Sequence, residues 1–246
     1  MQPMHIPRIN ARYWTAIALA SIFGTNLGDL YAHDSGLGLI GGVPVLVVLF
    51  LGVYIAERFD KISHEAYYWL CIIIMRTGAT NIADFMAGRR GWHIDRWVLS
   101  LGLGVLLAAL AWWAARDDRR LNGPNAAKVV PDTDPRYWVA MLTAGVFGTV
   151  LGDAFQKLIG QDVAAIALAV VFILALLVYR KGVFGSVYGY WLTVAVARTA
   201  GTAIGDALAE NETLKLGLPV ATALSGVAFV GVLALWRSRR GLAPAS

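Results

Sequence analysis

Apolar runs of roughly 20 residues recur along the whole chain, and about 20 such residues cross the hydrocarbon core of a bilayer as a helix. Eight such spans are expected, near residues 13–32, 37–56, 66–87, 92–115, 137–158, 162–180, 187–208 and 215–236. Charged residues make up only 15% of the sequence, whereas soluble domains carry about 25%. The pattern therefore predicts an all-α polytopic membrane protein and excludes a water-soluble one.

The formal charge of the chain is +5. Its basic residues flank the apolar runs, a pattern that sets the orientation of a protein in the membrane. If the N-terminus lies inside, the inside segments hold 14 Arg and Lys residues and the outside segments hold 5. We therefore expect both termini in the cytoplasm, and we expect no nucleic-acid partner.

Four related segments follow one another along the chain. A Tyr-Trp pair opens every odd-numbered span, at Tyr13-Trp14, Tyr68-Trp69, Tyr137-Trp138 and Tyr190-Trp191. An aspartate follows each Trp by 15 residues, at Asp29, Asp84, Asp153 and Asp206. Each aspartate closes a small-Thr-x-x-small-Asp motif, written GTNLGD, ATNIAD, GTVLGD and GTAIGD. A fixed spacing repeated four times indicates internal duplication.

The four segments are not equally alike. The first and third match at their starts, whereas the second and fourth share an arginine eight residues before the aspartate, at Arg76 and Arg198. We interpret the chain as a first four-helix half at 1–120, a cytoplasmic linker at 121–135 that is rich in turn-forming residues, and a second half at 136–246. Because each repeat has two spans, the halves should be parallel and pseudo-symmetric about an axis along the membrane normal.

These repeats resemble a family of bacterial membrane-anchored proteins built from four tandem copies of a two-helix repeat with a characteristic tryptophan. The resemblance covers nearly the whole chain. It implies the eight-helix fold and a multi-pass location in the bacterial inner (plasma) membrane. The family has no assigned biochemical function, so the resemblance leaves the function of this chain open.

On a helix, the motif creates two adjoining faces. Its small residues lie at i and i+4, which lets helix backbones approach closely in a membrane. Its Thr and Asp are also four residues apart and share a face. Four such helices would gather Thr25, Thr80, Thr149 and Thr202 with the four aspartates in one interior. The even-numbered spans carry almost no ionisable groups and are expected to face lipid.

The interior would hold a set of hard oxygen ligands. Two amides, Asn26 and Asn81, join the Thr hydroxyls and the carboxylates. Such oxygens suit Mg²⁺, Mn²⁺, Ca²⁺ or Na⁺ better than a soft metal, and no Cys or His accompanies the motif. The four aspartates are therefore candidate metal ligands, although they can equally carry protons or simply face water at the helix ends. No cofactor is expected beyond a transported divalent cation.

Arg76 and Arg198 each lie seven residues past a Trp, about 10 Å along a helix and near the middle of the membrane. Ionisable residues at this depth usually face the interior and pair with another group. A gate or a countercharge is the functional interpretation. The structural interpretations are an arginine that locks the bundle and one that snorkels to the surface.

We expect a transporter or permeation pathway for a small cation, either a divalent metal such as Mn or Mg or a proton-coupled ion. One alternative is an organic-solute or anion transporter that uses the two interior arginines. Another is a non-transporting membrane scaffold or sensor subunit. An enzyme is not expected, because four near-equivalent sites do not make one catalytic dyad. The partners expected are the lipid bilayer and the cation, with a homodimer if the small-residue faces pack between chains.

Overall fold

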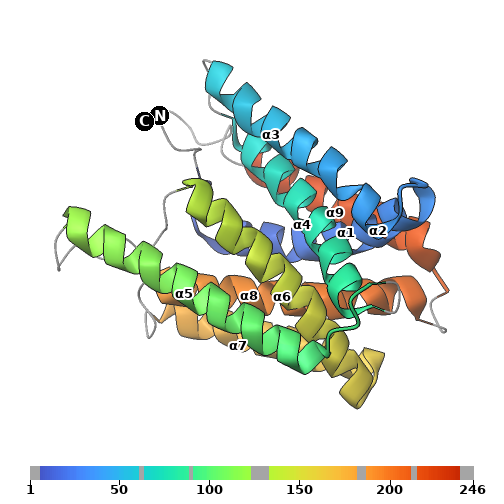
Figure 1. Ribbon diagram of the computed structural model, residues 1–246. Helices are drawn as coiled ribbons and strands as arrows, with labels where there is room; N and C mark the ends of the chain where they lie inside the picture. Colours follow the sequence, from blue (N-terminus) through green and yellow to red (C-terminus); the bar gives the residue numbers. More distant parts are fainter. Residues whose placement is uncertain are drawn as a thin grey trace.

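The computed structural model describes residues 6–60, 64–88, 91–122, 133–181, 187–211 and 215–238, and within them it contains helices and no strand (Figure 1). The helices are α1 (Ala11–Asp34), α2 (Gly38–Gly41), α3 (Val43–Phe59), α4 (Glu65–Ala87), α5 (Arg96–Asn122), α6 (Pro135–Ile159), α7 (Gln161–Arg180), α8 (Val187–Glu210) and α9 (Gly217–Ser238). Most of the predicted linker at 121–135 lies outside the described residues.

Side-chain caps fix the starts of two helices that carry the repeated motif. The Asn10 side chain accepts from the backbone N–H of Tyr13 at 3.1 Å, and the Asp134 side chain accepts from that of Tyr137 at 2.9 Å. Such caps satisfy backbone donors that the first turn of a helix leaves free. They place Tyr13 and Tyr137 in the first turns of α1 and α6.

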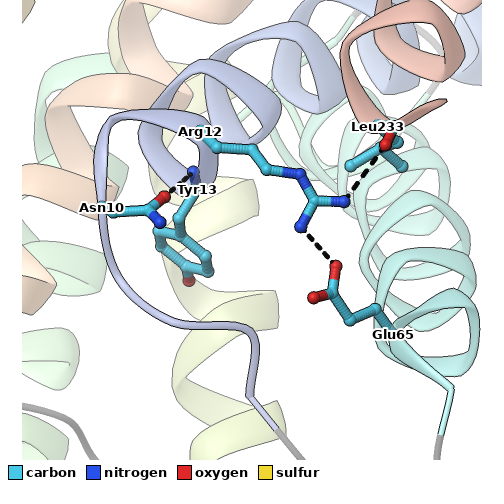
Figure 2. Close-up of polar contacts among 5 residues, drawn as sticks. All are labelled: Asn10, Arg12, Tyr13, Glu65 and Leu233. Carbon is cyan, nitrogen blue, oxygen red and sulfur yellow. Dashed lines mark hydrogen bonds and ion pairs between the residues drawn. The ribbon is translucent and has the colours of Figure 1, made fainter. Parts of the chain in front are cut away.

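A second contact joins this end of α1 to its neighbours (Figure 2). Arg12 donates to Glu65 of α4 at 2.6 Å and to the Leu233 carbonyl of α9 at 3.2 Å. The Arg12 side chain is only 10% exposed, whereas that of Glu65 is 41% exposed, so solvent screens the pair in part. It holds α1, α4 and α9 together at one end of the bundle.

The four helices that carry the motif form a closed ring. Helix α1 packs against α4 and α8, and α6 packs against the same two helices on the opposite side. The fully buried side chains are concentrated on these four helices, including Tyr13, Ile72, Met141 and Arg198. The core of the protein is therefore the axis of the ring.

The other long helices lie outside this ring. Helix α3 packs on α4, α5 on α6, α7 on α8 and α9 on α1. They expose large apolar side chains, for example Val48, Leu101, Ile166 and Val227. Exposed apolar surface on this scale suits contact with lipid tails. The chain is therefore a multi-pass membrane protein with its polar groups inside.

Among the described residues, α4, α5 within 96–116, α6, α7 and α9 within 217–236 are long and apolar enough to cross a membrane on their own. The sequence predicted eight spans. Helices α1 and α8 have 24 residues each and are long enough, but they are not apolar enough to qualify on their own. The run at 37–56 is divided at Gly42 into α2 and a 17-residue α3. Helix α5 begins later than expected, because the Asp95 side chain accepts from the N–H groups of Trp97 and Val98.

The small residues of the motif lie where the inner helices touch. A Cβ at Gly24 would come within 2.4 Å of Arg76 Cγ, and one at Gly201 within 2.3 Å of Ser21 Cβ. A Cβ at Gly148 would come within 2.7 Å of the backbone carbonyl carbon of Arg198. Glycine at these positions allows the close approach on which the ring depends.

We predict that Gly148→Ala destabilises the protein, because the neighbouring α8 backbone cannot move aside as a flexible side chain can. The expected loss is about 1–3 kcal/mol, the usual effect of overpacking. Gly102→Ala is the control, since an added Cβ there meets nothing within 4 Å. Thermal unfolding in detergent should show a lower Tm for Gly148→Ala alone, and equal Tm values would contradict the close approach.

Candidate functional site

Residues four apart along each inner helix form layers across the ring axis, since i and i+4 lie on one helix face. The Tyr layer is Tyr13, Tyr68, Tyr137 and Tyr190. The apolar layer is Ile17, Ile72, Met141 and Val194. The Arg layer is Ser21, Arg76, Gly145 and Arg198. The Thr layer is Thr25, Thr80, Thr149 and Thr202. The Asp layer is Asp29, Asp84, Asp153 and Asp206. The first four layers are buried, and the Asp layer is half-buried.

The four hydroxyls of the Tyr layer form a closed ring of hydrogen bonds. Tyr13 bonds Tyr68 at 2.8 Å, Tyr68 bonds Tyr137 at 2.7 Å, Tyr137 bonds Tyr190 at 2.8 Å, and Tyr190 bonds Tyr13 at 2.7 Å. Each hydroxyl can donate to one neighbour and accept from the other, so the ring is self-satisfied. The sequence analysis treated these tyrosines only as markers of the span starts. Their recurrence at one position of all four repeats was the signal that could have revealed the ring.

The apolar layer lies next along the axis and closes it further. Ile17, Ile72 and Val194 are 0% exposed, and Met141 is 1% exposed. The tyrosine ring and the apolar layer together fill this end of the axis with buried side chains. Hydrophobic constrictions of this kind close pores by excluding water.

The Thr layer surrounds the Arg76 guanidinium. Arg76 Nη1 donates to Thr149 at 2.7 Å and to Thr80 at 3.3 Å, and Nη2 donates to Thr25 at 2.5 Å and to Thr202 at 2.6 Å. The Gly145 carbonyl accepts from Nη1 at 3.3 Å. Each of the four inner helices therefore contributes one hydroxyl to a single buried charge.

Three of the four Thr hydroxyls direct their hydrogens to the backbone and away from the axis. Thr25 donates to the Ser21 carbonyl at 2.9 Å, Thr80 to the Arg76 carbonyl at 3.3 Å and Thr202 to the Arg198 carbonyl at 3.2 Å. With these hydrogens committed to the backbone, the oxygens present lone pairs inward. The layer is thus a set of acceptors, which suits a cation.

Arg198 occupies the same position on α8 that Arg76 occupies on α4, yet its side chain runs toward the opposite end of the axis. Its Nη1 donates to Ser21 Oγ at 3.2 Å and its Nη2 to Met141 Sδ at 3.3 Å. Both arginines are 1% exposed, so neither snorkels. Within the part of the chain that the structure describes, neither forms an ion pair with a carboxylate.

The Asp layer is less tightly connected than the Thr layer. Asp153 lies 3.5 Å from Arg96 Nε, and Asp206 accepts from Gln156 Nε2 at 2.7 Å. The sequence analysis did not single out Arg96 or Gln156, because their contacts depend on how α5, α6 and α8 meet. Across the described ranges, no three His, Cys, Asp or Glu side chains lie close enough together to hold a metal ion.

Asn26 and Asn81 follow Thr25 and Thr80 in the sequence, on the side toward the Asp layer. Both are 0% exposed, and neither the oxygen nor the nitrogen of either amide has a hydrogen-bond partner within the described structure. A buried polar group without a partner costs about 1–3 kcal/mol. These amides are therefore available to a ligand or to water.

We predict that Thr149→Val is strongly destabilising, because it removes an acceptor from the Arg76 charge while keeping the side-chain shape. Hydrogen bonds to charged groups contribute about 1.5–3 kcal/mol. Thr143→Val is the control on the same helix, since Thr143 is also buried but bonds only the Val139 carbonyl. Equal Tm values for the two variants would show that the Arg76 contact contributes nothing.

The comparisons with known proteins agree with the repeated pattern. A family model described as Repeat of Unknown Function (DUF347) matches the chain twice, at residues 12–61 and 189–241. The first match spans α1 to α3, and the second spans most of α8 and all of α9. No curated protein and no solved structure matches the chain significantly. The chain thus carries two matches to a repeat whose function is unassigned, which agrees with the resemblance to a repeat family of unassigned function.

Proposed function

We propose that the chain is a transporter or permeation pathway for a small cation, with the route along the axis of α1, α4, α6 and α8. The observation that carries the proposal is the Thr layer. Its oxygens converge on a positively charged group, with hydroxyl hydrogens of three of the four threonines committed to the backbone. Rings of inward-facing oxygens are a recurring way to replace the hydration shell of a cation.

The architecture proposed with this function has eight transmembrane helices in four tandem pairs. The ring contacts support it, because each outer helix packs mainly on an inner helix of another pair. Residues 1–120 and 136–246 would be two parallel, pseudo-symmetric halves. The excess of basic residues on one side supports an inner-membrane orientation with both termini in the cytoplasm.

The Asp layer and the two buried amides support entry of the cation from the Asp end. The amides of Asn26 and Asn81 follow the Thr layer in sequence on the side toward the Asp layer, and their oxygens have no partner in the described structure. A divalent ion such as Mn²⁺ or Mg²⁺ at the Asp layer would keep part of its hydration shell, because no three carboxylates converge there among the described residues. A proton-coupled ion fits the same carboxylates.

In this account, the structure corresponds to a closed state. The Tyr and apolar layers close one end of the axis, and Arg76 fills the Thr layer as a tethered cation. An incoming cation can occupy the threonine oxygens only when the Arg76 guanidinium leaves them. Arg76 therefore serves as the gate, and positive charge held in a pore also opposes the entry of free cations.

Two other functions each have one observation in their favour. An organic-anion transporter is favoured by two interior arginines without a carboxylate partner among the described residues. A scaffold or sensor subunit is favoured by the Tyr layer, which is fully hydrogen-bonded and needs no ligand. Neither function explains the inward-facing oxygens and the unpartnered amides together.

We predict saturable flux of a small cation into proteoliposomes, tested with Mn²⁺, Mg²⁺, Ca²⁺ and Na⁺ with and without a pH gradient. Asp29→Asn/Asp84→Asn should reduce the flux at least about tenfold, equivalent to about 1.4 kcal/mol of lost ion stabilisation. Asp34→Asn is the control, since Asp34 is an exposed acidic residue at the end of α1.

Absence of flux for every cation, with all proteins folded, would contradict the proposal. Uptake of an organic anion instead would favour the alternative that uses the arginines. A stable partner protein recovered in mild detergent, together with no flux, would favour the scaffold.

Removal of the Arg76 side chain provides a second prediction. Arg76→Ala leaves the Thr oxygens without their cation, while the Tyr and apolar layers still close the axis, so free guanidinium ion should bind the Thr oxygens and raise the Tm. Thr149→Val in the Arg76→Ala background is the control, because it removes one oxygen from the ring and should weaken this rescue. A guanidinium effect that is equal in both variants would show that the ion acts elsewhere.

A further inference from the structure

The two interior arginines offer a comparison within one molecule. Arg76 and Arg198 occupy equivalent positions, eight residues before an aspartate, and both are 1% exposed. The two terminal nitrogens of Arg76 meet four hydroxyls and one carbonyl. Those of Arg198 meet one hydroxyl and one thioether. The buried charge of Arg198 is therefore poorly compensated by the protein.

The two acceptors of Arg198 are weak. Ser21 Oγ accepts at 3.2 Å, a long distance for a charged donor, while donating its own hydrogen to the Ile17 carbonyl at 2.7 Å. Met141 Sδ is a thioether and a poor acceptor. The Nε atoms of both arginines lack a partner in the described structure, so the two residues differ only in the acceptors that meet their terminal nitrogens. A buried guanidinium normally requires acceptors for most of its N–H groups.

No neighbouring layer supplies negative charge. The apolar layer toward which Arg198 points consists of Ile17, Ile72, Val194 and Met141. The Tyr hydroxyls beyond it already satisfy one another. Arg76 lies in the same layer as Arg198 and adds a second positive charge. Two buried cations without a carboxylate partner among the described residues favour a counter-ion.

The residues around Arg198 also indicate the chemistry of that counter-ion. Met141 and Ser21 lie beside Arg198. The residues at the corresponding positions beside Arg76 are Ile17 and Gly145. Arg198 thus lies in a setting with one hydroxyl, one polarisable sulfur and otherwise apolar walls. Such a setting suits a weakly hydrated monovalent anion, because a phosphate or a divalent anion would lose far more hydration energy on burial.

We propose that Arg198 binds a small monovalent anion of the halide class inside the bundle, between the Tyr layer and the Thr layer. The anion accepts from Arg198 N–H groups that the protein leaves without acceptors. It is a resident counter-ion and not the transported species, so this inference does not rest on the proposed cation pathway.

Thermal unfolding of the purified protein tests this site. Wild type is transferred to sodium gluconate and titrated with sodium chloride or sodium bromide at constant ionic strength. The expected result is a saturable rise in Tm of about 2–4 °C, as for a ligand that binds only the folded state. Arg198→Met should abolish the rise, and Arg198→Lys should retain part of it. Arg12→Met is the control, since it removes a different largely buried arginine and should retain the full halide effect.

Bromide anomalous diffraction on the wild-type protein provides a test that needs no variant. A peak within hydrogen-bond distance of an Arg198 nitrogen supports the site. Equal Tm values in halide and gluconate, or no anomalous peak beside Arg198, would overturn it. Chloride flux through wild-type proteoliposomes would also overturn the resident role, because it would make the anion a cargo. None of these outcomes depends on the result of the cation-flux assay.

Discussion

The burial of the Arg76 guanidinium among four threonine hydroxyls is the interaction on which the inner ring depends. Each of α1, α4, α6 and α8 contributes one oxygen to the same charge. A guanidinium at this depth is tolerated only when its N–H groups find acceptors. Because glycines at the helix contacts allow the backbones to approach closely, all four oxygens can reach it. Displacement of one helix from the ring would remove one of these acceptors from the buried charge.

The side chains that line the axis of the inner ring change in polarity from one layer to the next. The axis begins with the self-satisfied Tyr layer, continues through an apolar layer, and reaches the two arginines and the Thr layer before the Asp layer. The side chains of Arg76 and Arg198 run in opposite directions, which separates two like charges that lie in the same layer. Of the five layers, only the Asp layer contains carboxylates. Arg96 and Gln156 bind two of its four aspartates.

Much of the fold followed from local patterns in the sequence. Apolar run length and four-residue spacing are properties of single helices, so they predicted the long helices, the tight small-residue contacts and the convergence of the threonines. The partners of each polar side chain depend instead on how separate helices align. For that reason the Tyr ring, the occupation of the Thr layer by Arg76 and the Arg96 contact were not foreseen. The threonines and aspartates lie in two layers one helical turn apart, as their four-residue spacing predicts.

The most direct test of a cation pathway that opens at the Asp end is to measure whether a water-soluble reagent reaches the axis. Cysteine is introduced as Asp29→Cys or Ile72→Cys in a Cys71→Ser background, which removes the only native cysteine. The protein in sealed vesicles is then exposed to a membrane-impermeant thiol reagent from either side. The account predicts that Asp29→Cys is labelled from one side and protected by the transported cation, whereas Ile72→Cys remains unlabelled. Equal labelling of both cysteines, or no labelling of Asp29→Cys from either side, would contradict it.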